Sequence, residues 1–493
     1  MRACCKGTEA VSVYKTLKHV CKSVRRNSKT DVQAVRCCAD ADEVRPGDVF
    51  FALDNGTLEE KPEETLEEAA GVAVHNGCIA VVAQKNINGL HGVPVFTVPN
   101  VAECYAAFCQ ALYDYPAKSL KITAVTGTSG KTSVSYLIAS ILTEAGYHTG
   151  LISSLGISDG SEFYYDSGNE LPPEQLAAWL YRMMMNGCTH AVIEVSSQCI
   201  AGGHLGGIQF DAVALTNIRK AHLDIHQSVA KYRRCKLDIF KYAKKNALAI
   251  CNADDRITEA VIPLIDHPLL TAGLRNQSAD VTGTLLERYP SEQTFFVTAG
   301  TETAAVRTTV IGDEHIQNCL TAAALCIGFD IDIKTVAKGI EEIQVIPGRM
   351  ERIECGQDFN VFIDSASAPD SLTAVLRTLR KVTENRLICV IGAAEGLKEA
   401  EHGAFAEALD RYADCAILTA EREEYSEESA EAICNLGGRF ADPYKATVIA
   451  NRSDAVSWAL TDAESGDTVL IIGNNVNAGS LMIPEEEQAV SCV

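Results

Sequence analysis

The clearest candidate for chemistry in this sequence is a glycine-rich segment that could hold phosphate groups. It lies between an apolar run, Leu120 to Thr126, and an amphipathic stretch, Thr132 to Ala145. The segment reads Val125-Thr126-Gly127-Thr128-Ser129-Gly130-Lys131-Thr132-Ser133. Glycines let backbone N–H groups approach phosphate oxygens, and a helix start adds positive dipole. Lys131 is placed to reach the β and γ phosphates, and the Thr132 hydroxyl can hold Mg²⁺.

The loop departs from the commonest phosphate-binding pattern at one position. Position 125 is Val, where that pattern has its first Gly. A chance glycine turn is the alternative interpretation. The strand before the loop and the helix after it favour a phosphate-binding loop, because the cradle requires that placement.

Three other side chains are candidates, and each is ambiguous when taken alone. Glu194 ends an apolar run, His222 stands in a polar segment, and Lys236 lies in a charged stretch. A single Glu or His is more often structural than a ligand, and a single Lys is more often an exposed helix residue. Their order relative to the loop is therefore needed to give them a role.

Composition limits the class of protein. The 493 residues are too many for one hydrophobic core, which predicts about three domains. A net charge of -22 argues against nucleic acid as a partner, because polyanion binding needs a basic face. The nineteen Cys are scattered through apolar contexts without metal-binding spacing, which indicates buried thiols in the cytoplasm. No apolar run approaches the length of a membrane span.

The pattern of apolar runs predicts an α/β protein of three domains. Residues 1–118 read as a small α/β domain, 119–345 as a central parallel-sheet domain with the phosphate loop, and 346–493 as a second open, Rossmann-like α/β sheet. The central strands are expected at Leu120–Thr126, Ala191–Val195, Ala212–Leu215 and Leu248–Cys251. The loop is thus expected to connect the first of these strands to the helix that follows it.

Further motifs follow the loop in a fixed order. They are Glu194-Val195-Ser196-Ser197, Thr216-Asn217, Ala221-His222-Leu223-Asp224, Tyr232 with Lys236, Asn252-Ala253-Asp254-Asp255, a helix opened by Asn318, and Pro347-Gly348-Arg349-Met350-Glu351 before Asp364. Together with the loop that lacks its first Gly, this order resembles the Mur ligase family over nearly the whole chain. The resemblance implies an ATP-dependent amide ligase that joins an amino acid, of diaminopimelate or lysine type, to a UDP-MurNAc-peptide in peptidoglycan synthesis.

The resemblance also assigns roles to residues. It implies that Thr132 and Glu194 hold one Mg²⁺, and that His222 helps to place a second. Lys236 matches a lysine that is carbamylated in the family, and would bind metal in that form. Asn252, Arg349 and Asp364 match positions beside the nucleotide. A monomer is expected.

Several family motifs for the two substrates are changed in this sequence. The altered segments are Ala39-Asp40-Ala41, Leu171-Pro172-Pro173, Ser196-Ser197-Gln198, Asp364-Ser365-Ala366-Ser367, the loop from Gly392 to Lys398, Ala420-Glu421-Arg422-Glu423 and Gly473-Asn474-Asn475-Val476-Asn477. Two hypotheses follow. The chain is a ligase with altered substrate contacts, or it is a catalytically weak paralogue that binds nucleotide or partners without turnover. Retained Lys131, Glu194, His222 and Lys236 favour the ligase.

Overall fold

The computed structural model describes residues 10–21, 23–28, 31–53, 65–90, 92–165, 170–219, 228–393, 399–420 and 426–473. The chain divides into two compact units. The first unit comprises Met1–Cys251 and Asp255–Leu270, and the second comprises Asn252–Asp254 and Thr271–Val493.

The first unit begins with a small sheet whose strands run in the order β2-β7-β6-β5-β4. Helices α1 and α3 cover one face, which Val49 and Phe51 enter, and α2 covers the other, which Phe50 and Val81 enter. This alternation is the period of two that a strand imposes on its side chains. The elements are β1 (Val11–Ser12), α1 (Val13–Val20), β2 (Arg25–Arg26), β3 (Gln33–Ala34), β4 (Cys37–Cys38), β5 (Val49–Phe51), α2 (Leu66–His75), β6 (Ala80–Ala83), β7 (Val95–Thr97) and α3 (Val101–Leu112).

The larger sheet of the first unit runs in the order β11-β10-β9-β12-β8-β13-β14. Its elements are β8 (Lys121–Thr126), α4 (Lys131–Glu144), β9 (Thr149–Ser153), β10 (Gly156–Ser158), β11 (Phe163–Tyr165), α5 (Pro173–Met185), β12 (His190–Val195), α6 (Ser197–Ala201), β13 (Phe210–Leu215), α8 (Val229–Leu237), β14 (Ala243–Asn252) and α9 (Arg256–Val261). Strand β8 is parallel to both of its neighbours, β12 and β13. The strand order reverses around β8, and ligands of open α/β sheets bind beyond the carboxyl ends at such a point.

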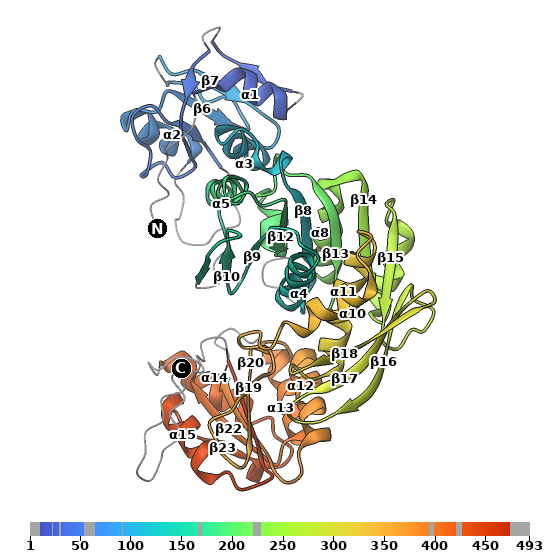
Figure 1. Cartoon of the computed structure of the whole chain (residues 1–493). Helices are drawn as coiled ribbons and strands as arrows, with labels where there is room; N and C mark the ends of the chain where they lie inside the picture. Colours follow the sequence, from blue (N-terminus) through green and yellow to red (C-terminus); the bar gives the residue numbers. More distant parts are fainter. Residues whose placement is uncertain are drawn as a thin grey trace. The chain divides into compact units, whose positions relative to one another are not determined.

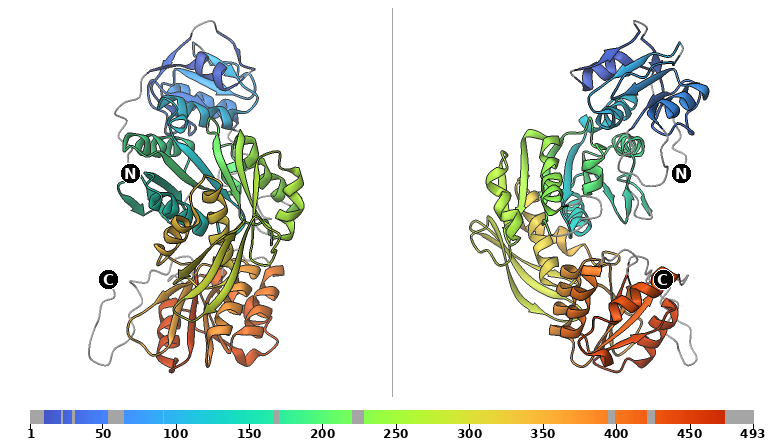
Figure 2. Two further views of the ribbon diagram at one scale, coloured as in Figure 1. Left: turned by 45° about the vertical axis from the view of Figure 1, so that its right-hand side comes forward. Right: turned by 180° about the vertical axis from the view of Figure 1, so that it is seen from behind.

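Helices α3 and α5 lie side by side between the two sheets of this unit (Figures 1 and 2). Ala177 of α5 is buried in the same cluster as Phe51 and Phe108 of the small sheet and its helix. The Tyr105 hydroxyl of α3 also donates a hydrogen bond of 2.9 Å to the Glu174 carboxylate of α5. The two sheets therefore share part of a core.

The second unit begins with a run of paired strands followed by two helices. Strands β16, β17 and β18 are antiparallel neighbours, and β15 pairs with β16 in parallel. Helix α10 follows these strands, and most of its residues are buried. The elements are β15 (Leu269–Gly273), β16 (Val281–Arg288), β17 (Gln293–Ala299), β18 (Glu302–Thr308), α10 (Asp313–Ile327) and α11 (Ile333–Glu341).

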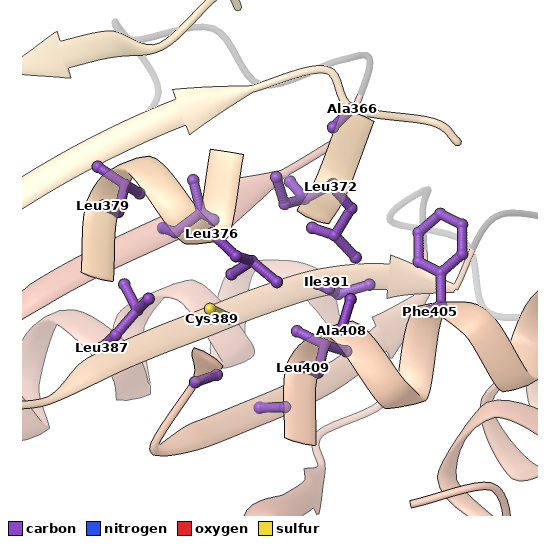
Figure 3. Close-up of a cluster of buried hydrophobic side chains, with 14 of the residues drawn as sticks. Ala366, Leu372, Leu376, Leu379, Leu387, Cys389, Ile391, Phe405, Ala408 and Leu409 are labelled. Carbon is purple, nitrogen blue, oxygen red and sulfur yellow. The ribbon is translucent and has the colours of Figure 1, made fainter. Parts of the chain in front are cut away.

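The rest of the second unit is an open sheet in the order β19-β20-β24-β21-β22-β23. Leu387, Cys389 and Ile391 of β21 face α12 and α13 (Figure 3), while Ile388 and Val390 face α15. Both faces of the parallel strands are therefore covered, as such strands require. The elements are β19 (Glu351–Ile353), β20 (Asn360–Asp364), α12 (Pro369–Val382), β21 (Leu387–Ala393), α13 (Glu399–Tyr412), β22 (Cys415–Ala420), α14 (Glu427–Gly437), β23 (Ala446–Val448), α15 (Arg452–Asp462) and β24 (Thr468–Ile472).

The predicted fold class, α/β with parallel sheets, is confirmed. One helix start was predicted wrongly: α10 begins at Asp313, not at Asn318. The boundaries between the three expected domains stay a prediction, since the small sheet and the phosphate loop fall in one compact unit. Among the residues that the structure describes, no helix combines the length and the apolar character that crossing a membrane requires.

Candidate active site

The phosphate loop joins β8 to α4 at the middle of the larger sheet. Gly130 caps α4 with a φ of 80°, and Gly127 has a φ of 154°. A Cβ on Gly127 would lie 1.9 Å from the Thr216 hydroxyl oxygen, which no side chain tolerates. Gly130, the N-cap residue of α4, has no side chain that could accept a hydrogen bond from the first turn. The glycines and the helix start therefore have the backbone geometry that an anion cradle requires, and phosphate binding by this loop stays a prediction.

The end of β13 holds the loop in shape. The Asn217 side chain accepts a hydrogen bond of 3.0 Å from the Ser129 N–H and donates one of 3.0 Å to the Ser129 carbonyl. The Thr216 hydroxyl donates to the same carbonyl at 2.6 Å. Thr216-Asn217 thus belongs to the site by bracing the loop, which lowers the conformational entropy lost when phosphate binds.

Thr132 and Glu194 are linked by a residue that the sequence analysis missed. The Ser154 N–H donates to Glu194 Oε2 at 3.0 Å, and the Ser154 hydroxyl lies 3.0 Å from that of Thr132. Lys131 Nζ lies 3.9 Å from Glu194 Oε1 and donates to the Thr128 carbonyl at 3.3 Å. Hydroxyl, carboxylate and ammonium groups thus meet at the carboxyl ends of β8, β9 and β12.

The oxygen atoms of Thr132 and Glu194 fit a magnesium ion shared with phosphates. Magnesium prefers oxygen ligands and is usually held by one or two carboxylates together with substrate phosphates and water. Within the described residues, no three His, Cys, Asp or Glu side chains gather in a way that could hold a metal without such a substrate.

Lys236 is buried beneath the loop instead of lying on the helix surface. Its side chain is 1% exposed, and Nζ donates a hydrogen bond of 3.1 Å to the Thr126 hydroxyl, which in turn donates to the Val195 carbonyl at 2.8 Å. Tyr232, one turn earlier on α8, is also buried, and its hydroxyl lies 3.1 Å from that of Thr128. The α8 face that carries Tyr232 and Lys236 therefore packs against the phosphate loop.

Burial lowers the pKa of Lys236 to about 7, with the positive charge of Lys131 as the next cause. Glu194 and Glu170 act in the opposite direction. The Glu170 carboxylate accepts a hydrogen bond from the Ser196 hydroxyl, and burial raises the pKa of Glu170. A substantial fraction of Lys236 is therefore a neutral amine at neutral pH.

This shift predicts a pH-dependent effect of Lys236 on stability. The folded pKa is about 7 and the ordinary value is 10.5, so the unfolded chain binds the extra proton between these values. The buried charge of Lys236 therefore destabilises the folded state most below pH 7, and this destabilisation disappears as the pH rises toward 10.5. Lys236→Met should raise the free energy of unfolding by about 3 to 5 kcal/mol at pH 6. Near pH 10.5 the gain should vanish.

Urea unfolding in CO₂-free buffer at the two pH values measures this difference. Lys231→Met, an exposed position on the same helix, is the control and should show no pH-dependent gain. An equal gain for Lys236→Met at both pH values would contradict a buried amine with a lowered pKa.

Three further predicted residues lie in the second unit. The Asn252 side chain is buried and accepts a hydrogen bond of 2.8 Å from the Asp254 N–H. Asp364 ends β20, is 8% exposed, and accepts a hydrogen bond of 2.8 Å from the Met350 N–H. Burial raises the pKa of Asp364, and the positive charge of nearby Arg349 partly offsets the rise. Arg349 and Asp364 thus lie close together at the end of β20, where the Met350 N–H holds the Asp364 carboxylate in place.

Comparison with known proteins places the chain in a family. Residues 125–326 match the Mur ligase middle domain, and residues 348–475 match the family model described as "Mur ligase, glutamate ligase domain". The chain is 31% identical over 441 residues, 88% of each protein, to UDP-N-acetylmuramoyl-L-alanyl-D-glutamate--2,6-diaminopimelate ligase of Bacillus licheniformis. The chain belongs to the Mur ligase family. The family predicted from the sequence motifs is confirmed.

Other similar proteins agree with this assignment. The ligase of the same name from Geobacillus thermodenitrificans is 29% identical over 458 residues, 91% of each protein. A solved structure of a UDP-N-acetylmuramoyl-L-alanyl-D-glutamate--2,6-diaminopimelate ligase superposes with a TM-score of 0.67 at 23% identity, covering 94% of this chain and 93% of that one. That likeness supports the fold.

Some predicted parts of the Mur ligase site lie outside the described residues. His222 lies in residues 220–227, outside the described residues, so its role stays a prediction. The same holds for most of the loop from Gly392 to Lys398, for residues 421–425 and for the chain after Gly473. Residues Gly127, Thr128, Ser129, Gly130, Lys131, Thr132, Ser133, Glu194 and Lys236 are brought to one place, while Asn252, Arg349 and Asp364 belong to the other unit.

Proposed function

We propose that this Mur ligase uses ATP to join an amino acid to UDP-N-acetylmuramoyl-L-alanyl-D-glutamate in peptidoglycan precursor synthesis. The observation that carries the proposal is the meeting of Lys131, Thr132, Glu194 and buried Lys236 at the carboxyl ends of β8 and β12. The relatives from Bacillus licheniformis and Geobacillus thermodenitrificans are named for that substrate and for diaminopimelate, which makes diaminopimelate the first amino acid to test.

The reaction makes a poor acyl donor reactive. A carboxylate oxygen of the substrate bonds to the γ-phosphorus of ATP while the bond between that phosphorus and the bridging oxygen breaks, so ADP leaves. The amine nitrogen of the amino acid then bonds to the acyl carbon, and phosphate leaves as the nitrogen loses a proton. Phosphoryl transfer of this kind depends on positioning and on neutralisation of charge.

The residues of the phosphate loop supply both requirements. Its backbone N–H groups and the start of α4 orient the phosphates, and Lys131 offers a charge-assisted hydrogen bond to the transferred group. Thr132 and Glu194 would hold a magnesium ion there, and Ser154 keeps their two oxygen groups in place. When bound, the ion neutralises negative charge on the phosphates.

The lowered pKa of Lys236 supports the proposal that this residue becomes a carbamate. Only the neutral amine attacks CO₂, forming an N–C bond and releasing a proton. An ordinary lysine is almost wholly protonated at pH 7, whereas a pKa of about 7 leaves a large neutral fraction. The product replaces the buried neutral amine with an anion, whose oxygens would hold a second magnesium ion and so help to neutralise negative charge on the phosphates.

Dependence of phosphate release on both co-substrates is the test of the proposed function. We expect purified protein with Mg²⁺ and ATP to release phosphate only when UDP-N-acetylmuramoyl-L-alanyl-D-glutamate and an accepted amino acid are both present, because the acyl phosphate must form and then be consumed. Omitting each component in turn is the control, across a panel of diamino acids.

Two results would contradict this expectation. Phosphate release without either co-substrate would indicate simple ATP hydrolysis. No release with any amino acid, together with intact ATP binding, would favour the non-catalytic paralogue instead.

A further inference from the structure

Two thiols of the first unit meet in the wall of a pocket that has no role in the site described above. The pocket has a volume of about 540 Å³ and lies between helix α3 and the segments that lead into β13 and β14. Cys21, the residue at which α1 ends, and Cys104, near the start of α3, both line it. Cys104 belongs to the apolar cluster on this face of the small sheet, and Cys21 packs against the same cluster. The two residues, which we call the accessible pair, therefore lie where this core borders the pocket.

The two thiols of the accessible pair interact directly, and they differ in their exposure to solvent. Burial raises the pKa of Cys104 to about 12, and the interaction with the Cys21 thiol adds to that rise. Cys104 is only 4% exposed, whereas Cys21 is partly exposed and its thiol donates a hydrogen bond of 3.6 Å to the Ser23 carbonyl. A dissolved molecule therefore reaches Cys21 first. An exposed thiol with a second thiol beside it is the arrangement in which oxidation ends in a disulfide.

A second thiol pair on the same helix provides an internal comparison. The sulfur atoms of Cys37 on β4 and Cys109 on α3 are 3.5 Å apart, and we call these two residues the buried pair. Their side chains are 7% and 1% exposed, and neither residue lines the pocket. Both pairs thus join α3 to a neighbouring element through two thiols in contact. They differ in whether a dissolved oxidant can reach one of the sulfur atoms.

The backbone at Cys21 suits the small shift that a covalent bond requires. A disulfide brings the two sulfur atoms to about 2.05 Å, closer than thiols in contact, so one side of the pair must move. Cys104 is fixed within α3, whose first turn is capped by the Asn100 side chain through a hydrogen bond of 3.1 Å from the Glu103 N–H. The Cys21 N–H donates to the Leu17 carbonyl at 2.8 Å, but Cys21 itself has the extended angles φ −133° and ψ 124°. The side that must move is therefore the end of a helix and not its interior.

We infer that Cys21 and Cys104 are a site of reversible oxidation, at which a hydroperoxide such as hydrogen peroxide converts the two thiols into a disulfide. The Cys21 thiolate attacks one peroxide oxygen, the O–O bond breaks, and the departing hydroxide takes up a proton to become water. The Cys104 sulfur then attacks the sulfur of the resulting sulfenic acid, the S–O bond breaks, and a second water leaves with the Cys104 proton. Two thiols are oxidised to one disulfide while the peroxide is reduced to two water molecules. The new bond ties the end of α1 to the start of α3 and restricts the unfolded chain.

Limited oxidation of the folded full chain, followed by mass spectrometry, tests the inference. The protein is treated with hydrogen peroxide, its remaining thiols are alkylated, and it is digested with trypsin and chymotrypsin without reduction. Cleavage after Tyr105 and Phe108 separates the two cysteines of α3, so the two pairs give different linked peptides. We expect the link within the accessible pair to form before any link within the buried pair, because susceptibility to oxidation follows exposure. Dithiothreitol should remove the link, and the oxidised protein should unfold at a higher urea concentration than the reduced protein.

Two variants and one change of conditions complete the test. Cys21→Ser should abolish the link to Cys104, whereas Cys109→Ser, the matched control from the buried pair, should leave that link unchanged. Oxidation in urea, where the fold is lost, should remove the preference for the accessible pair. Failure of the accessible pair to link, equal linking of both pairs in the folded protein, or the same preference in urea would each overturn the inference. No nucleotide or substrate enters the test, so its result does not depend on the proposed function.

Discussion

Lys131→Ala is expected to lower turnover by about 10² to 10³-fold, because one charged donor to the transferred phosphoryl group is removed. ATP affinity should fall by about 10-fold or more, since a hydrogen bond to a charged group contributes about 1.5 to 3 kcal/mol. Lys131 Nζ is already held 3.9 Å from Glu194 and bonded to the Thr128 carbonyl, so it is positioned before ATP binds.

Two measurements separate this effect from a loss of folding. Calorimetry with a non-hydrolysable ATP analogue gives the affinity, and phosphate release gives turnover. Lys121→Ala removes an exposed lysine from the start of β8 and should leave both unchanged. Parent-like nucleotide affinity in Lys131→Ala would contradict the phosphate-loop interpretation.

Local sequence patterns predicted the elements around the loop because their causes are local. The helix after the loop was expected at Thr132 to Ala145 and spans Lys131–Glu144. Its start is set by glycines that adopt backbone angles few other residues reach. The central strands were also predicted, since parallel strands buried on both faces are nearly continuous apolar runs. Helix α10 was placed too late because Gly312, with a φ of 123°, starts it before the Asn318 motif.

Residues that act through contacts between strands could not be predicted in this way. Ser154 follows β9 and joins Thr132 to Glu194, but nothing near it in the sequence distinguishes it from other serines. Thr126 was taken only as part of the loop, although its hydroxyl is the hydrogen-bond acceptor for Lys236. These roles arise where β8, β9 and β12 lie side by side. The sequence of a single strand does not determine which strands become its neighbours in the sheet.

The burial of Lys236 could not be predicted from the local sequence for a related reason. Helix α8 reads Val-Ala-Lys-Tyr-Arg-Arg-Cys-Lys-Leu, which looks like an exposed, charged helix. Tyr232 and Lys236 lie four residues apart and therefore share one face, and that face packs on the phosphate loop. Family resemblance gave Lys236 a role, whereas the structure shows that burial lowers the pKa of its amine.

Lys236→Ala is expected to lower turnover by about 10³-fold or more while leaving ATP affinity within about twofold of the parent, because the residue is proposed to act as an anionic metal ligand in phosphoryl transfer. Thr126 keeps its hydrogen bond to the Val195 carbonyl, so the loop should keep its shape in the variant. Phosphate release and analogue binding measure the two quantities. Lys231→Ala on the same helix is the matched control and should retain activity.

A short carboxylate supplied in solution should partly restore turnover to Lys236→Ala. The substitution leaves a space beneath the loop, and the group proposed to be missing from it is an oxygen anion, which acetate or formate can provide. An uncharged molecule of similar size, acetamide, should not restore activity, because an amide oxygen carries no full negative charge to balance a magnesium ion. Equal rescue by acetamide would indicate that Lys236 only fills space, and full activity of Lys236→Ala without any addition would rule out the carbamate.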